Sequence, residues 1–229
     1  SGELTDQLTK ILAYERDPIA AVENILDLSV VNGGLRRREH LGLYAGPIGT
    51  ATVVLNPAID EGSQGTSQTG TIVVGLGELG SLTASSLAKT VQAGIVRFLL
   101  ELHQSSCIGS GPGSGPVPVR LASLLLGCNS STNILIEDSM SAVTLGVLAG
   151  SRQFAEAFPD SRLRITDLEF IELYLDTAIS AAHVLQRLPE KLALQCTEHR
   201  ARLMPNPLLQ ERPGLLRRPG HVRLLGHHP

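Results

Sequence analysis

Tryptophan is absent from this chain, and aromatic residues make up only 3% of its 229 residues. So few rings leave little material for stacking the bases of a nucleotide or a nucleic acid. The formal net charge of −3 gives no excess of positive charge that would favour nucleic acid or a membrane surface. We therefore expect a partner of neither kind.

Cysteine is also scarce: Cys107, Cys128 and Cys196 are too scattered for a disulfide framework, and none forms a CxxC pair. This usage is typical of a reducing compartment, so we expect a cytoplasmic protein. No apolar run reaches the roughly 18 residues of a membrane span, and no signal peptide is evident. The chain begins Ser1-Gly2 without Met, so we expect either a domain excised from a longer protein or a start left by its expression.

Aliphatic residues, in contrast, are plentiful enough for a real core, because hydrophobic residues make up 42% of the chain. Apolar and β-branched runs predict strands at residues 24–31, 50–55, 71–76, 119–126 and 163–173. The near-continuous run at 71–76 predicts a strand buried on both faces. Between the strands, apolar steps of three and four residues predict helices that place one face in the core: Leu87, Val91, Ile95, Phe98, Leu99 and Leu102 in the first, residues 134–158 in the second, and 177–188 in the third.

The order of these segments predicts an α/β fold with a mixed or mostly parallel sheet of about five strands. Asp176 is the predicted N-cap of the last helix, and Pro189 its predicted end. Residues 1–23 form a polar lead-in, and residues 24–204 form the predicted α/β domain.

The tail, residues 205–229, differs in composition from the rest. It carries four arginines against one acid, Glu211, so its +3 leaves about −6 for the remainder of the chain. Five of the 13 prolines lie in it. We expect this basic, proline-rich tail to be disordered, with a basic arm for an acidic partner as the alternative. The run 36–40 (RRREH) is interpreted in a similar way, as a solvated face or, alternatively, an anion-binding patch.

A glycine motif carries the first candidate site. Residues 75–80 (GLGELG) form a G-x-G-x-x-G between a predicted strand and a predicted helix, as a dinucleotide fingerprint requires. The candidate ligand-binding residues there are Gly75, Gly77, Glu78, Gly80 and Ser81. Glu101 would be the ribose-binding acid, but only if residues 95–102 form a second strand. A glycine-rich turn without a ligand remains the alternative.

Cys128 carries the second candidate site. It follows a predicted strand, and His103 could serve as the base that activates it in a small cysteine hydrolase. The alternative is a buried, inert cysteine. The hydroxyl and N–H groups of Asn129 and Ser130 could line an anion site at the same turn.

Metal and hydrolase signals are weak. Asp167, Glu169, Glu172 and Asp176 form an acidic stretch, but no His or Cys joins it, and a solvated sheet edge accounts for it. No G-x-S-x-G, Walker A, HExxH or EF-hand motif occurs. We therefore predict no metal site.

Residues 41–50 (LGLYAGPIGT) and 71–77 (TIVVGLG) resemble the N-terminal domain of leucyl aminopeptidases, which is macro-like. The resemblance covers roughly residues 29–188. The chain also looks similar to a region of large bacterial CHAT-domain (caspase-like) proteins, an impression strengthened by residues 168–174 (LEFIELY). The resemblance implies a macro-like three-layer sandwich and a modular role. It implies no peptidase activity, because the metal-bearing catalytic domain is absent from this sequence.

The sequence therefore predicts a non-catalytic interaction or regulatory module of a larger bacterial protein, without a cofactor. Its partners would be other domains of the same polypeptide or another protein. The first alternative is a nucleotide or dinucleotide binder that uses the GLGELG turn. The second is the cysteine hydrolase built on Cys128 and His103.

Overall fold

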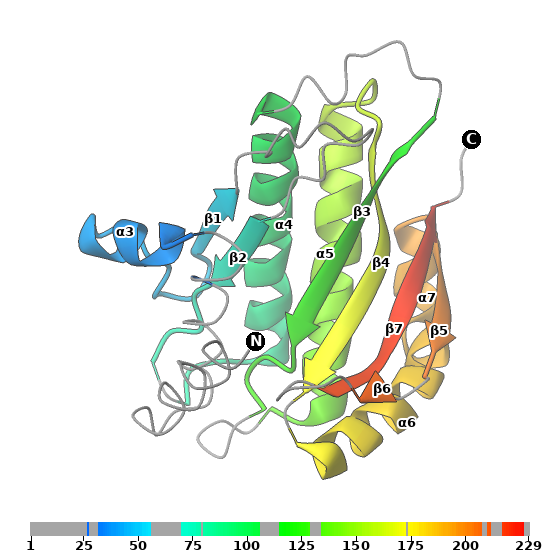
Figure 1. The fold of residues 1–229 in the computed structure, drawn as a ribbon. Helices are drawn as coiled ribbons and strands as arrows, with labels where there is room; N and C mark the ends of the chain where they lie inside the picture. Colours follow the sequence, from blue (N-terminus) through cyan, green and yellow to red (C-terminus); the bar gives the residue numbers. More distant parts are fainter. Residues whose placement is uncertain are drawn as a thin grey trace. The chain divides into compact units, whose positions relative to one another are not determined.

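A computed structural model, drawn in Figure 1, describes the chain in segments: residue 27 and residues 32–55, 70–78, 80–105, 115–128, 134–172, 174–207, 210–211 and 217–226. The chain divides into two compact units. The smaller unit comprises Ser1–Ala45 and Thr52–Val73, and the larger comprises Gly46–Ala51 and Val74–Pro229. Each unit is described by itself below.

The smaller unit contains helix α3 (Gly34–His40) and most of strands β1 (Ala51–Leu55) and β2 (Gly70–Val74), which pair in a two-stranded sheet. Its core is small: buried Leu35 and Val54 pack with Tyr44 and Val73. The strands predicted at 50–55 and 71–76 are confirmed. The expectation that the second of them is buried on both faces is wrong, because four of the five residues of β2 are only half-buried. Among the described strands, β2 pairs with β1 alone.

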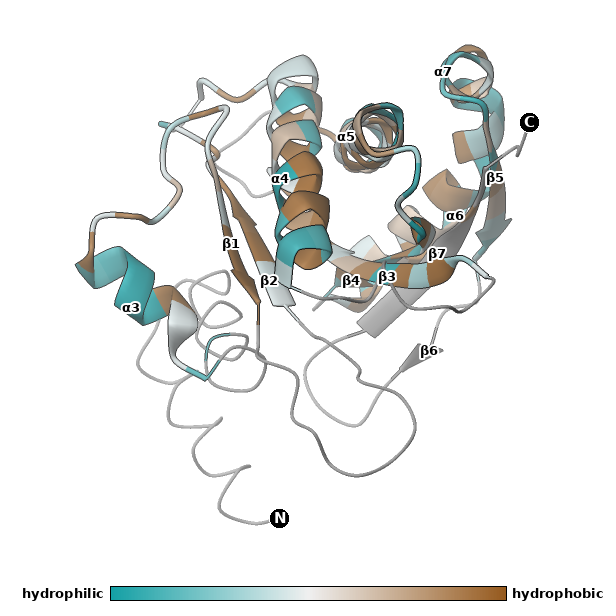
Figure 2. Cartoon of the chain, turned by 90° about the horizontal axis from the view of Figure 1, so that it is seen from above, coloured by the Kyte–Doolittle hydropathy of each residue, from teal (hydrophilic) through white to brown (hydrophobic). Residues whose placement is uncertain are grey.

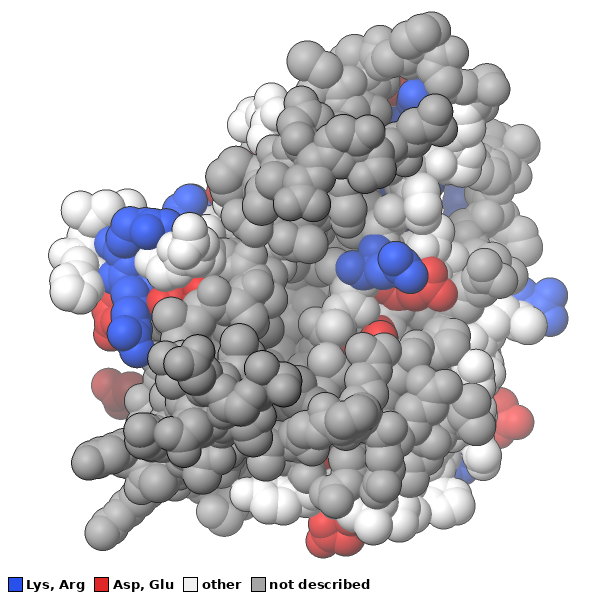
Figure 3. All heavy atoms as spheres, viewed as in Figure 1, with Lys and Arg blue, Asp and Glu red and all other residues white. Residues whose placement is uncertain are grey.

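Asp27 organises the start of α3. Its carboxylate is buried and accepts a hydrogen bond from the Leu35 backbone N–H at 2.6 Å. Its own carbonyl accepts the Gly33 N–H at 2.8 Å. Asp27 is the one described residue of the strand expected at 24–31, and it is helical, so that expectation fails there. Arg36 and Arg37 are exposed, which agrees with the solvated face and with the anion-binding alternative. Figure 3 shows blue Lys and Arg side chains gathered on the side of the molecule where Figure 1 draws α3.

The larger unit is built on a mixed sheet of strand order β3-β4-β7-β5, with the short β6 (Gln210–Glu211) beside β7. Strands β3 (Val117–Leu124) and β4 (Leu163–Glu172) are parallel. Strand β7 (Arg217–Gly226) runs antiparallel to β4 and to β5 (Ala201–Asn206). The predicted mixed α/β fold is therefore confirmed.

Helices α5 (Ile136–Ala157), α6 (Leu175–Lys191) and α7 (Ala193–Glu198) lie on one face of this sheet, as Figure 2 shows. Helix α4 (Ala84–Ser105) packs along α5. The six apolar residues predicted to face the core from α4 are all buried. The helices approach closely at Gly146, where an added Cβ would lie 2.6 Å from the Ala88 carbonyl oxygen.

The ends of α6 differ from the prediction. Tyr174, not Asp176, is the N-cap residue, and Asp176 lies in the first turn, where its carboxylate opposes the positive end of the helix dipole. Pro189 lies inside the helix rather than at its end. Proline lacks one N–H donor, but the helical pattern continues past it with the Leu192 N–H donating to Leu188 at 3.0 Å.

The tail is the largest correction to the predicted organisation. Residues 217–226 form β7 inside the sheet, although the tail was expected to be disordered. The register places Arg223 opposite Asp167 of β4, and Arg217 opposite Glu172. The backbone of the tail segment that was expected to be disordered therefore pairs with the acidic strand β4.

Within the part of the chain that the structure describes, none of the helices combines the length and the apolar character needed to cross a membrane.

Candidate functional site

The glycine turn lies between β2 and α4, and its amides are engaged by the neighbouring segment Gly46–Ala51. The Gly75 N–H donates to the Thr50 carbonyl, and the Gly77 N–H donates to the Gly46 carbonyl, both at 2.9 Å. A Cβ added at Gly75 would lie 2.5 Å from Thr50 Oγ1 and closer still to the Pro47 carbonyl. Position 75 requires glycine because two backbone segments cross there and leave no room for a side chain. Since the Gly75 and Gly77 amides donate within the chain, they are not available to bind a pyrophosphate.

Two of the remaining candidate residues of this turn, Glu78 and Ser81, are hydrogen-bonded to each other. Ser81 Oγ donates to the Glu78 carbonyl at 2.6 Å, and Gly80 has a left-handed backbone (φ 81°). At the start of α4, the Ser86 N–H donates to Thr83 Oγ1 at 3.1 Å, while the Thr83 N–H donates to Ser86 Oγ at 2.9 Å. This reciprocal cap satisfies N–H donors that a phosphate would otherwise need.

Glu101, the candidate ribose acid, lies in the helix α4 rather than at the end of a strand. The helix continues without a break from Ala84 to Ser105, and Glu101 pairs with Arg97 one turn earlier at 3.3 Å. The second strand that a dinucleotide fold needs is therefore replaced by helix. This arrangement weighs against the dinucleotide hypothesis.

Cys128 and His103 are not brought together. The His103 ring packs against Phe154 and Phe158 near the end of α5, with ring centroids 6.0 and 5.0 Å away. Cys128 hydrogen-bonds with Ser139, in the first turn of α5. Ser139 and Phe154 are fifteen residue steps apart along α5, which is about 22 Å at the usual helical rise and well beyond the reach of a base.

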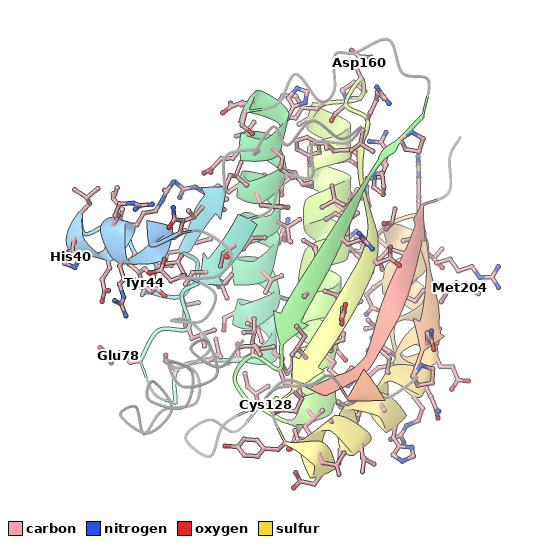
Figure 4. The ribbon with its side chains drawn as sticks, in the orientation of Figure 1. His40, Tyr44, Glu78, Cys128, Asp160 and Met204 are labelled. Atoms are coloured by element: carbon pink, nitrogen blue, oxygen red, sulfur yellow. The ribbon has the colours of Figure 1, made fainter. Side chains whose placement is uncertain are left out.

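The environment of Cys128 also disfavours a thiolate. Burial raises the pKa of this thiol above its ordinary value, and the negative charges of Glu172 and Asp138 raise it further. The hydrogen bond with Ser139 acts in the opposite direction but is outweighed. Figure 4 shows Cys128 near the end of β3. A thiol with a raised pKa is a poor nucleophile at neutral pH.

Three other residues singled out from the sequence lie outside the described residues: the candidate anion-binding residues Asn129 and Ser130, and Cys107.

Cys128 lies at the edge where the parallel strands β3 and β4 end and where α5 and α6 begin, here called the carboxyl edge. In α/β sheets such edges are the usual place for binding. Glu172 ends β4 and accepts the Tyr174 N–H through Oε1 at 3.1 Å. Lys191, from the end of α6, pairs with Glu137 at 3.2 Å and with Asp138 at 3.3 Å.

Sequence reasoning missed Tyr174 and Lys191 at this edge. The order of the strands along the chain could have indicated this edge, because the carboxyl ends of parallel strands such as β3 and β4 meet at one edge of a sheet. The sequence interpretation of the acidic stretch 167–176 weighs a metal site against a solvated sheet edge and does not address this edge. Among the described residues, no group of three or more His, Cys, Asp or Glu side chains could hold a metal ion.

No protein-family model, curated protein or solved structure matches this chain. The functional argument therefore depends on the residues of the chain itself.

Proposed function

We propose that this chain is a non-catalytic α/β module, macro-like in character, that makes protein contacts within a larger cytoplasmic bacterial protein. Its partners are other domains of the same polypeptide or a separate protein. The macro-like character follows from the resemblance of residues 41–50 and 71–77 to the N-terminal domain of leucyl aminopeptidases.

One observation carries the interaction role. At the start of α6, Tyr174, Leu175 and Ile179 are 56%, 40% and 43% exposed. The other side of the same helix is fully buried at Ala178, Ala181 and Leu185. Large apolar side chains that gather on the surface beside a well-packed face are typical of a protein interface.

The two enzyme or ligand hypotheses have less support. The glycine turn uses the Gly75 and Gly77 amides internally, and Glu101 is helical. Cys128 lies far from His103, and burial raises the pKa of its thiol. Neither arrangement supplies the geometry that its chemistry requires.

A ligand screen tests this proposal. We expect NAD, ATP and ADP-ribose, each at millimolar concentration, to leave the melting temperature of the full chain unchanged. A ligand at 100 times its Kd would stabilise the folded state by about 2.7 kcal/mol, which a thermal shift assay detects easily. A clear, concentration-dependent stabilisation by any of the three would contradict the interaction module and favour a nucleotide binder.

A further inference from the structure

The five-stranded sheet of the larger unit has two outer strands, β3 and β5. In the strand order β3-β4-β7-β5, each of them has one neighbour among the strands that the structure describes. The side of an outer strand that faces away from its neighbour presents backbone N–H and C=O groups, which can pair with a strand of another chain. Proteins block such edges with proline, with charged side chains or with an irregularity in the pairing.

Strand β3 carries all three of these features over a few residues. The Val117 N–H donates to the Arg162 carbonyl at 2.8 Å, so the backbone groups of Val117 face the side of β4. Because these groups alternate in direction along a strand, the nitrogen of Pro118 faces the outer side, where it offers no N–H. Arg120 is exposed, and the register with β4 shifts between Val119 and Arg120.

Strand β5, at the other edge, also carries a proline and an arginine. Pro205 lies opposite Val222 of β7, and Arg202 is exposed three residues earlier. Leu203 is buried, whereas Met204 is 43% exposed. This alternation would suit a strand to which a further strand could be added, but Pro205 has no N–H to donate to one.

The two edge prolines differ from the proline of the inner strand β7. Pro118 and Pro205 each lie in register with a residue of the neighbouring strand, Arg164 and Val222 respectively. Pro219 of β7 lies where the register with β4 is irregular. The outer strands therefore keep their pairing around a proline, as expected where the proline nitrogen faces away from the neighbour.

We propose that Pro118 and Arg120 on β3, and Arg202 and Pro205 on β5, keep either edge of this sheet from adding a strand of a second copy of the chain. Each proline withholds an N–H from an incoming strand. A two-fold contact brings the same strand of two copies together, so it also brings two like charges to one edge. This inference goes beyond the proposed interaction role, because it concerns the sheet edges and holds for any partner of the module.

The test opens one edge at a time in the full chain. Pro118→Val/Arg120→Thr gives β3 an additional N–H and two β-branched residues, so β3 should pair with β3 of a second copy. Light scattering coupled to gel filtration should find the wild-type chain at 24.3 kDa and this variant near twice that mass as its concentration rises. Arg202→Thr/Pro205→Val should dimerise through β5 in the same way.

Combining the four substitutions gives a sharper expectation. A copy with two open edges can bind two neighbours, so the fourfold variant should form assemblies larger than a dimer. Backbone hydrogen exchange locates the contact: amides of the opened strand should exchange more slowly as the protein concentration rises, while those of α6 should not change.

Helix α6 offers the matched control. Arg187→Thr/Pro189→Val removes the same two residue types, also two positions apart, but leaves both sheet edges unchanged. This control should keep the wild-type mass. The single variants Pro118→Val and Arg120→Thr should associate more weakly than the double variant, because each leaves one block in place.

Four results would overturn the proposal. These are edge variants that melt like the wild-type chain and stay monomeric, a control that associates as strongly as they do, association without slower exchange in the opened strand, and a wild-type chain that already associates through β3 or β5. If a double variant does not fold, Arg120→Thr and Arg202→Thr, which keep the prolines, decide by the same criteria. The nucleotide screen is independent of all these outcomes, so failure of this inference and failure of the proposed function are distinguishable.

Discussion

Gly75 is the residue on which the crossing of two backbone segments depends. Its backbone is not left-handed, so the demand for glycine there comes from space alone. The oxygens of Pro47 and Thr50 occupy the volume that a side chain would need. Gly77 adds a conformational demand, because its φ of 72° is strained for other residues. The motif that resembles a nucleotide fingerprint in sequence is thus explained by packing.

Substitution of Gly75 tests this explanation. Gly75→Ala should lower the free energy of unfolding by about 1–3 kcal/mol, because the new methyl group cannot fit without a backbone shift. Gly46→Ala is the matched control: Gly46 lies in the same crossing, but an added Cβ there meets nothing within 4 Å. Both substitutions restrict the unfolded chain equally. The difference between their free energies of unfolding therefore measures the steric clash of the added methyl group at position 75. Equal unfolding midpoints of the two variants in urea would contradict the steric account.

At the scale of elements, the end of α7 is held against α5 by a small polar cluster. Arg152 of α5 donates to the Glu198 carbonyl at 2.7 Å and pairs with Glu156 at 2.7 Å. His199 follows Glu198, and its Nδ1 is buried without a hydrogen-bond partner among the described residues. Burial lowers the pKa of His199; the nearby Arg152 lowers it further, while Glu198 and Glu156 oppose the shift.

This cluster makes stability depend on pH. Since the pKa of His199 is lower in the folded state, the unfolded state binds its proton more readily, and stability is lost as the pH falls below about 6.5. His199→Gln should therefore reduce the slope of unfolding free energy against pH between 7 and 5. His183→Gln, a substitution at an exposed position of α6, should keep the wild-type slope. Urea melts across this range measure both. A wild-type slope in His199→Gln would show that other groups dominate.

Helices with a regular spacing of apolar residues were predictable from the sequence. The pairing of the strands into sheets was not. The apolar spacing of α4 and α5 gave nearly the right bounds, because one face of each helix is continuously buried. The strand predicted at 71–76 is apolar enough for a central position in a sheet, yet β1 is the one described strand with which β2 pairs. Composition could not reveal that pairing partner, since any apolar strand satisfies the same pattern.

The candidate site was predicted less well than the fold, for a related reason. The cysteine and glycine motifs were recognised by residue type, but their chemistry depends on neighbours that lie far away in the sequence. His103 is 25 positions from Cys128, but packs at the other end of α5. Tyr174 and Leu175 fall between the strand predicted at 163–173 and the helix predicted at 177–188, and their exposure becomes evident only once α6 is packed on the sheet.

On the scale of the whole molecule, the basic tail supplies a central strand of the larger unit. Strand β7 lies between β4 and β5, and Leu224 is buried in the core. Pro219 lies where the register between β4 and β7 is irregular, a position that tolerates the missing N–H of proline. The basic charge and the proline content of residues 205–229 predicted disorder because composition does not indicate which strand a segment pairs with. In the structure, β7 pairs with β4.

Truncation separates a structural strand from a dispensable tail. A chain that ends at Glu211 should lose cooperative unfolding, because β4 and β5 lose their shared neighbour and the buried Leu224 is removed. A chain that ends at Gly226, the last residue of β7, should melt like the full chain. Near-ultraviolet circular dichroism and thermal melting measure both. A cooperative melt of the shorter chain at the wild-type temperature would contradict the central position of β7.

The position of β7 also has a consequence for synthesis. Of the strands that the structure describes, β7 is synthesised after β3, β4 and β5, yet it joins β4 and β5. Until Arg217–Gly226 has left the exit tunnel, β4 and β5 each lack their shared neighbour and present unpaired backbone groups. The sheet of the larger unit is therefore completed only after β7 has emerged. Exposed strand edges persist throughout elongation, and a nascent chain stalled before Arg217 would be the species most prone to aggregate.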